Sequence, residues 1–151
     1  QGMRYLDMGG FIDMTAGESS KNGYSLPDAI EKLIQENKNL NHVTISSDGN
    51  GSNPSNGEQG SGICKMSQLF QDMRTSILDK KMDMSLVFKL ATENVAKFLK
   101  IFPRKGILKS GSDADILILN KDTLDIDTVI SRGKIMMKDS EIVKKGKFES
   151  V

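Results

Sequence analysis

One aspartate, which lies between a short apolar run and a glycine-rich stretch, is the residue of this chain best placed to do chemistry. Val43 and Ile45 alternate with polar residues, a pattern typical of a strand, and residues 46–52 then follow as Ser-Ser-Asp-Gly-Asn-Gly-Ser. α/β barrels place their catalytic groups on loops at the carboxyl ends of strands. The position of Asp48 therefore predicts a catalytic acid on such a loop.

The same stretch has a second interpretation without any catalytic role. Asp48-Gly49 and Asn50-Gly51 are both dipeptides that favour hairpin turns, and the composition as far as Gly62 is that of a linker. Long loops without apolar periodicity are either functional or disordered. From spacing alone, a turn or a linker stays open beside the catalytic interpretation.

Other reactive side chains are few. The chain has one histidine, His42, and one cysteine, Cys64, whereas a catalytic zinc site needs three or more protein ligands. We expect His42 to be structural and Cys64 to be a small buried residue beside an apolar helix face. The sequence has no phosphate-binding glycine motif, no nucleophile elbow and no paired CxxC. Asp48 alone cannot carry out a hydrolysis.

Composition excludes several classes of protein. There are 21 basic and 20 acidic residues in 151, so a net charge of +1 argues against nucleic-acid binding. No apolar run is long enough to span a membrane. A single cysteine cannot form an internal disulfide, which favours a reducing compartment and predicts a cytoplasmic protein. Gln1-Gly2 before Met3 resembles the remnant of a cleaved tag and is left out of the fold prediction.

The elements that must position Asp48 form a strand–helix–strand unit. Residues 9–15 are predicted to form a buried strand, in which we expect Asp13 to play a structural part at the strand end. A helix begins after Ser25, with Ser25 as N-cap and Asp28 completing a capping box, and the next strand covers residues 42–45. Two strands joined through a helix predict a parallel pair.

Two further helices and several strands follow the loop. Apolar residues at helical spacing predict a helix over 63–79 and another from Asp83 or Ser85 to Leu99, with Phe102-Pro103 ending it. Short strands are expected at 114–119, 128–131, 134–137 and 142–143, with turns at 132–133 and 139–140. The fold class is α/β, and the change to strands alone suggests two domains or an added layer.

A resemblance to a known family rests on four segments of this sequence. Residues 46–52 resemble the last active-site segment of isoaspartyl (β-aspartyl) dipeptidases, which belong to the amidohydrolase superfamily. Residues 9–15 are similar to the preceding barrel strand of that family, 91–96 with 106–115 to the closing segment of the superfamily, and 131–139 to its final hairpin. The 46–52 segment is the most specific of the four.

This resemblance implies a fold and an activity. Residues 3–104 would form the C-terminal part of a (β/α)₈ TIM-like barrel of a metal-dependent hydrolase, and residues 105–151 the strands of a small β-sandwich domain. The family binds two Zn²⁺ ions through four histidines, a carboxylated lysine and an aspartate, and it hydrolyses β-aspartyl dipeptides. By the match, Asp48 is that aspartate and accepts a proton during catalysis, while Ser52 binds the substrate.

The other ligands of the family are absent from this sequence, so we expect the 151 residues alone to be inactive and to bind Zn²⁺ weakly. Unpaired edges on the strands near Gly10 and Val43 predict a homo-oligomer, most simply a symmetric dimer, and the loop over 48–62 is expected to be mobile. Two alternatives stay open: another amidohydrolase such as a dihydroorotase-like cyclic amide hydrolase, or a non-catalytic α/β assembly or interaction protein.

Overall fold

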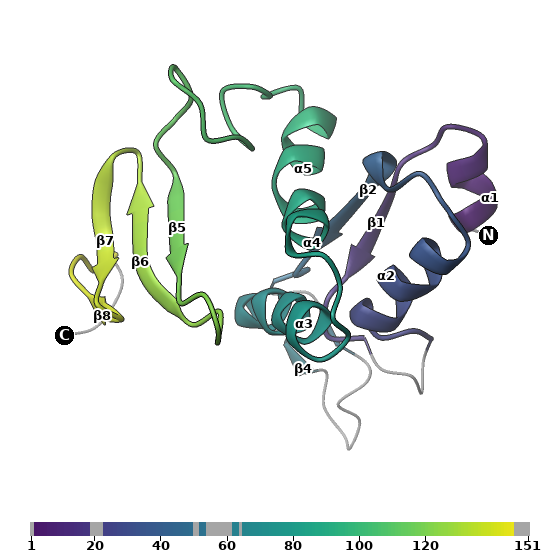
Figure 1. Ribbon diagram of the computed structural model, residues 1–151, viewed down its shortest axis with the longest axis horizontal. Helices are drawn as coiled ribbons and strands as arrows, with labels where there is room; N and C mark the ends of the chain where they lie inside the picture. The colour runs from purple at the N-terminus through teal and green to yellow at the C-terminus, as the bar shows by residue number, and fades with distance from the viewer. Residues whose placement is uncertain (1, 19–22, 50–51, 54–61, 64, 147–151) are drawn as a thin grey trace.

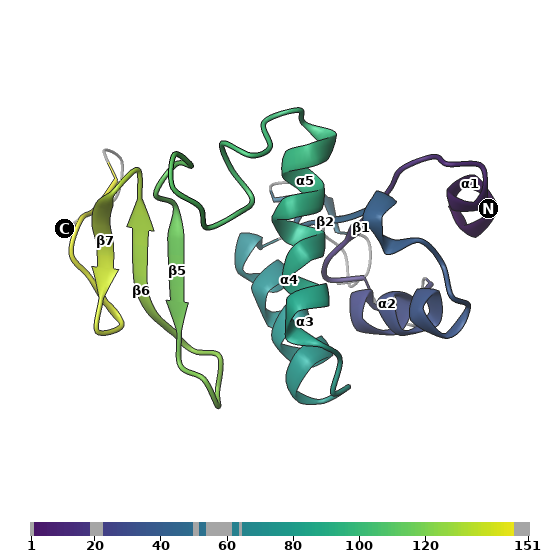
Figure 2. The same ribbon diagram turned by 45° about the horizontal axis from the view of Figure 1, so that its top comes forward.

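The computed structural model describes residues 2–18, 23–49, 52–53, 62–63 and 65–146 of the chain. Figure 1 shows helices α3, α4 and α5 between a parallel strand pair on one side and an antiparallel sheet on the other, and Figure 2 shows the same arrangement. The elements in chain order are α1 (Gly2–Asp7), β1 (Ile12–Thr15), α2 (Leu26–Gln35), the 3₁₀ helix η1 (Leu40–His42), β2 (Val43–Ser46), β3 (Ser52–Asn53), β4 (Gly62–Ile63), α3 (Met66–Leu78), α4 (Met84–Ala91), α5 (Glu93–Phe98), β5 (Ile116–Leu119), β6 (Ile126–Ser131), β7 (Lys134–Lys138) and β8 (Glu141–Ile142).

Strands β1 and β2 form the predicted parallel pair. Ile12 lies opposite Val43 and Thr15 lies opposite Ser46. Helix α2 connects them and begins as expected, because Ser25 accepts a hydrogen bond from the Asp28 amide at 3.3 Å. The Asp28 carboxylate accepts a hydrogen bond from the Ser25 hydroxyl at 2.6 Å, so the two side chains cap the helix together.

The predicted boundary between the loop over 48–62 and the helix over 63–79 is wrong. Residues 62–63 pair with 52–53 as a short antiparallel ladder, so Ile63 belongs to β4 and α3 begins only at Met66. Met66 is 77% exposed and therefore lies outside the buried face, which contains Met73 and Ile77. Helical spacing alone could not distinguish Ile63 and Met66 from the buried residues Met73 and Ile77, because all four are apolar and recur three or four residues apart in the same pattern.

The single helix expected up to Leu99 is divided into α4 and α5. Thr92 lies between them with φ −122° and ψ −82°, and its hydroxyl donates to the Phe88 carbonyl at 2.8 Å. A threonine bonded back to the preceding turn often bends a helix. Helix α4 begins at the predicted cap, since the Asp83 carboxylate accepts a hydrogen bond from the Leu86 amide at 2.7 Å.

The four predicted C-terminal strands are confirmed as an antiparallel sheet in the order β5-β6-β7-β8. Two-residue turns join β6 to β7 and β7 to β8. Arg132 and Gly133 have φ of 49° and 73°, and Asp139 and Ser140 have φ of 52° and 63°. Positive φ at both central residues matches the right-handed twist of a hairpin, which fixes the register of these strands.

The core lies between β1, β2 and the helices that cover them, and also includes one residue from the C-terminal part. Its buried residues are Leu6, Ala16, Leu26, Ile30, Leu33, Val43, Ile45, Met73, Ile77, Val87, Leu90 and Leu124. Leu124, between β5 and β6, is only 1% exposed, and Arg74 on α3 donates to the carbonyl of the adjacent Thr123 at 2.8 Å. The β5–β6 connection is therefore attached to the helical layer.

Helix α1 was not predicted, and it places Leu6 in the core at 4% exposure. Gly2, which was left out of the sequence-based fold prediction, is the first residue of this helix. Over the described residues, every helix is too short or too polar to cross a lipid bilayer.

Candidate active site

Asp48 lies two residues beyond the C-terminal end of β2, as the sequence predicted. Its side chain is exposed, and its φ of 45° turns the chain away from the strand direction. The Gly49 amide donates to the Ser47 hydroxyl at 3.2 Å, which closes a small turn around Asp48. A Cβ on Gly49 would lie 2.6 Å from Cγ of Met66, so this exposed methionine side chain at the start of α3 would have to move to accept any larger residue here.

The hairpin interpretation of this stretch is wrong for Asp48-Gly49. β2 pairs in parallel with β1, and the antiparallel ladder that follows joins 52–53 to 62–63. Ser52 is the first residue of β3 and lies opposite Ile63. The Ser52 side chain and Cys64 lie outside the described part of the chain, as do most residues of the loop that was predicted to be mobile.

The two faces of the β1–β2 pair are chemically different. Val43 and Ile45 are buried in the core, and Thr44 and Ser46 alternate with them. On the β1 side, Asp13 accepts a hydrogen bond from the Thr44 hydroxyl at 2.6 Å and one from the Ser46 hydroxyl at 2.5 Å. The face opposite the core therefore carries a connected polar cluster that ends two residues before Asp48.

The loop that leaves β1 is held at the same end of the strand pair. The Ala16 amide donates to the Ser46 carbonyl at 2.8 Å. The Gly17 amide donates to the Asp72 carboxylate at 2.9 Å, and the Gln68 side chain donates to its other oxygen at 2.7 Å. Asp72 on α3 thereby attaches the loop after β1 to the helix that follows Asp48, a link with no signal in the sequence.

His42 lies at the opposite end of β2 from Asp48. Its Nδ1 is 3.1 Å from the Gly9 carbonyl oxygen, and its ring stacks on Phe11 with centroids 4.3 Å apart. These contacts agree with the structural role expected for this residue. The tertiary structure does not bring the histidine to the candidate acid.

The described residues do not by themselves fit a metal ion. Over those ranges, no three side chains of the histidine, cysteine, aspartate and glutamate types come together as a ligand set. Asp48 offers one exposed carboxylate, and a catalytic zinc site takes at least three protein ligands. A metal at this strand end would need ligands from outside the described part of the chain.

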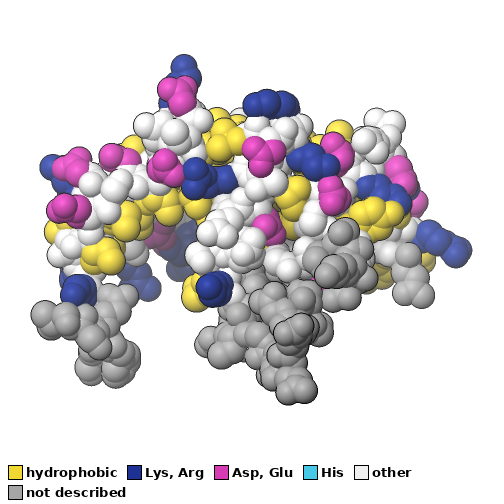
Figure 3. Space-filling view, turned by 90° about the horizontal axis from the view of Figure 1, so that it is seen from below, with side chains coloured by type: hydrophobic (Ala, Val, Ile, Leu, Met, Phe, Trp, Pro, Cys, Tyr) yellow, Lys and Arg dark blue, Asp and Glu magenta, His cyan; other side chains and the backbone are white. Residues whose placement is uncertain are grey.

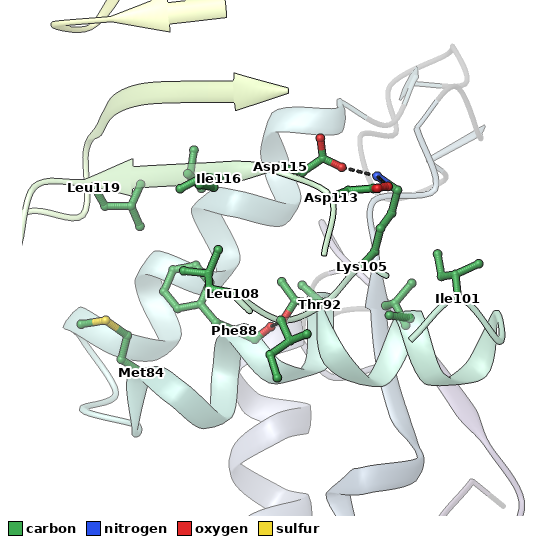
Figure 4. Close-up of a pocket in the computed structure, with 16 residues that line it drawn as sticks. Met84, Phe88, Thr92, Ile101, Lys105, Leu108, Asp113, Asp115, Ile116 and Leu119 are labelled. Carbon is green, nitrogen blue, oxygen red and sulfur yellow. Dashed lines mark hydrogen bonds and ion pairs between the residues drawn. The ribbon is translucent and has the colours of Figure 1, made fainter. Parts of the chain in front are cut away.

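A separate cleft of about 630 Å³ lies between α4, α5 and β5. Its lining is mainly apolar and includes no residue of β1, β2 or the Asp48 turn. Figure 4 shows Lys105, Asp113 and Asp115 at one end and Met84 with Leu119 at the other. Lys105 contacts both carboxylates and, together with the Arg132 amide, lowers the pKa of Asp115. This ion cluster lines one end of the cleft and does not extend the candidate site.

Comparison with known proteins decides the family. The family model described as the amidohydrolase family matches residues 21–136, which is most of the chain. The chain belongs to the amidohydrolase family. The predicted family is therefore confirmed, and with it a mixed α/β fold related to TIM-barrel hydrolases.

Two solved structures are similar over nearly all of this chain. One is a β-aspartyl dipeptidase from Fervidobacterium islandicum AW-1 in complex with β-Asp-Leu dipeptide, which is 34% identical with a TM-score of 0.84. The match covers 99% of this chain and 38% of the dipeptidase chain. A second structure of the dipeptidase from that organism is 33% identical with a TM-score of 0.77, covering 99% of this chain and 36% of its own. This chain thus spans less than two-fifths of the length of these relatives.

A more distant solved structure shares only the fold. N-acetylglucosamine-6-phosphate deacetylase from Pasteurella multocida is 11% identical with a TM-score of 0.61, and it covers 85% of this chain and 37% of its own. Its chemistry therefore says nothing about the substrate of this chain.

Proposed function

We propose that this sequence is the C-terminal part of a zinc-dependent β-aspartyl dipeptidase, which hydrolyses the peptide bond formed by the side-chain carboxyl of aspartate. The observation that carries the proposal is the similarity to the F. islandicum dipeptidase, at 34% identity over 99% of this chain. That relative is in complex with β-Asp-Leu, a β-aspartyl dipeptide. The strand-end position and exposure of Asp48 support the same proposal.

In this proposal Asp48 is a zinc ligand and the general base of the reaction, and Ser52 binds the substrate. A general base must be within hydrogen-bond reach of the proton that it accepts. The exposed carboxylate of Asp48, on a turn at the carboxyl end of β2, is accessible to a substrate at that edge. The 151 residues contribute this one ligand, so we propose that they are inactive alone and that the remaining ligands come from elsewhere in the enzyme.

We also propose a division of the chain at residues 104 and 105. The parallel pair and α2 to α5 come before this boundary, and the antiparallel strands β5 to β8 come after it. The first part, 3–104, would complete a (β/α)₈ barrel, and 105–151 would contribute strands to a small β-sandwich. The change from strands that alternate with helices to four consecutive antiparallel strands supports this division.

Self-association of the isolated chain is part of the proposal. In the four-stranded sheet β5 and β8 are edge strands, and Leu117, Ile118 and Ile142 on them are exposed. Figure 3 shows hydrophobic side chains between charged ones over much of the face seen from below. Exposed apolar surface beside free strand edges favours association. Sedimentation at micromolar concentration should give a dimer or larger species, and a clean monomer would contradict this part of the proposal.

The activity test uses the full-length gene product loaded with Zn²⁺ and compares β-Asp-Leu with α-Asp-Leu. We expect hydrolysis of the β-linked dipeptide only. Asp48→Asn should lower turnover at least about 100-fold, because the amide cannot accept the proton. The matched control is Asp139→Asn, another exposed aspartate with positive φ, which lies in the β7–β8 turn and should leave turnover unchanged.

Three results would contradict the proposal in different ways. Near-wild-type turnover in Asp48→Asn would reject the role of Asp48 alone. Hydrolysis of dihydroorotate without cleavage of β-Asp-Leu would favour the cyclic amide hydrolase. A full-length product that binds no zinc and cleaves none of these substrates would favour the non-catalytic assembly protein, which the lack of a ligand set in the described residues also allows.

A further inference from the structure

The carboxylate of Asp13 connects the two strands directly below the turn that carries Asp48. One of its oxygens accepts a hydrogen bond from Thr44 at 2.6 Å, and the other accepts one from Ser46 at 2.5 Å. We propose that Asp13 is a positioning residue, which holds the end of β2 so that Asp48 is correctly placed for catalysis. This inference rests on the role proposed above for Asp48.

Ser46 is the last fixed point of β2 before Asp48. The β1–β2 ladder ends where Thr15 lies opposite Ser46. The Ser46 carbonyl accepts from the Ala16 amide at 2.8 Å, and its hydroxyl donates to Asp13 at 2.5 Å. Asp48 comes only two residues later, so a shift of Ser46 is transmitted to it through two peptide units.

Asp13 is an unusual residue for its position, since aspartate is depleted in strands. Its side chain is exposed, and over the described residues it forms no ion pair with a lysine or arginine. The half-buried Ser46 hydroxyl could bond to water, and the buried Thr44 hydroxyl also lies 3.5 Å from the Ile12 carbonyl oxygen, so neither hydroxyl strictly requires a carboxylate. Natural proteins break local sequence preferences mainly at functional sites.

A carboxylate also suits this geometry better than an amide. Both of its oxygens are acceptors, so it can receive the two hydroxyl protons at once. In asparagine, Oδ1 can keep one of these hydrogen bonds, whereas the amide nitrogen can keep the second contact only by donating to that hydroxyl, whose proton then needs another acceptor. Alanine loses both. We therefore expect the displacement of Ser46 to increase from aspartate to asparagine to alanine at position 13.

The test measures kcat and KM for β-Asp-Leu in the full-length, zinc-loaded gene product. Asp13→Ala should lower kcat about tenfold and change KM less than about twofold, because a displaced Asp48 acts in the chemical step rather than in substrate binding. Asp13→Asn should recover part of the loss. The double variant Thr44→Val/Ser46→Ala should lower kcat by a similar factor, and adding Asp13→Ala to it should cause little further loss.

A matched control is available in the C-terminal sheet. Asp127 on β6 accepts a hydrogen bond from the Thr128 hydroxyl at 2.7 Å, so Asp127→Ala also removes a carboxylate–hydroxyl contact, but one remote from Asp48. It should leave kcat unchanged. Unfolding midpoints for all variants separate loss of stability from loss of rate, and if Asp13→Ala does not fold, Asp13→Asn and the hydroxyl variants carry the test.

Three results would overturn the inference. If the wild-type product cleaves β-Asp-Leu and all folded Asp13 and hydroxyl variants keep its kcat, Asp13 is only structural and the proposed function stands. Fully additive losses of kcat would equally show that Asp13 does not act through the two hydroxyls. If the wild-type product does not cleave β-Asp-Leu, the proposed function fails first and this inference fails with it.

Discussion

Asn94 is the buried side chain whose replacement gives the sharpest test of how the strand pair is attached to the helices. It is fully buried in α5, and its amide nitrogen donates to the carbonyls of Leu40 and Val43 at 2.7 Å each. These two carbonyls lie immediately before and at the start of β2. The amide thus fixes the N-terminal end of β2, whereas Asp13 holds the other end.

The size of the effect follows from these contacts. Asn94→Leu keeps the branched side-chain skeleton, but its methyl groups are bulkier than the amide and it removes two hydrogen bonds, each with a net contribution of about 1 kcal/mol. The Leu40 carbonyl still accepts from the Val43 amide, so it is not left without a partner. We expect a loss of at least about 2 kcal/mol, because the larger side chain also strains a fully buried position. Asn94→Asp should cost about 3–5 kcal/mol, because an unpaired buried carboxylate would face two carbonyl oxygens.

The assay is urea unfolding of the 151-residue chain followed by far-ultraviolet circular dichroism, since the sequence has no tryptophan to report by fluorescence. Asn41→Ala is the control, because Asn41 is exposed and forms its hydrogen bond with Lys89 at the surface. It should change stability by less than about 0.5 kcal/mol. An Asn94→Leu variant as stable as wild type, or a tolerated Asn94→Asp, would refute the reasoning.

Three further predictions concern other parts of the chain. Gly106→Ala should cost about 2–4 kcal/mol in the free energy of unfolding, because Gly106 has φ of 84° and an added Cβ would lie 2.7 Å from the Cβ of Ala96. The control is Gly111→Ala, which has φ of 90° and open space around it and should therefore show the backbone strain alone. Equal thermal midpoints for the two variants would contradict this prediction. Lys105 and the Arg132 amide lower the pKa of Asp115 from its ordinary value of 3.8. The ionised carboxylate therefore stabilises the fold above pH 3.8, and this contribution is lost as pH falls through the lowered pKa. In thermal melts from pH 5 downward, the unfolding midpoint of Asp115→Asn should fall less than that of wild type, and parallel curves would count against this prediction. Zn²⁺ added to the 151-residue chain should bind weakly and without defined stoichiometry, since the described residues bring no three ligands together; one tight site per chain in calorimetry would show that the ligand assignment is wrong.

The sequence by itself determined most of the longer elements and the location of the candidate acid. Alternation and helical spacing are local properties, so they predicted the parallel pair, the cap at Ser25 and the four C-terminal strands. The family was predicted from the resemblance of four segments to a known family, of which residues 46–52 are the most specific. The role of Asp48 itself stays a prediction.

Only the tertiary structure decided which side chains meet. Asp13 and Ser46 are 33 positions apart, and Asn94 and Val43 are 51 apart, so no periodic pattern connects them. The start of α3 at Met66 and the break at Thr92 were likewise set by packing and by one hydroxyl, not by apolar spacing. Hydrogen bonds between distant residues depend on the relative placement of elements, and that placement is fixed by burial of the whole core rather than by any local stretch.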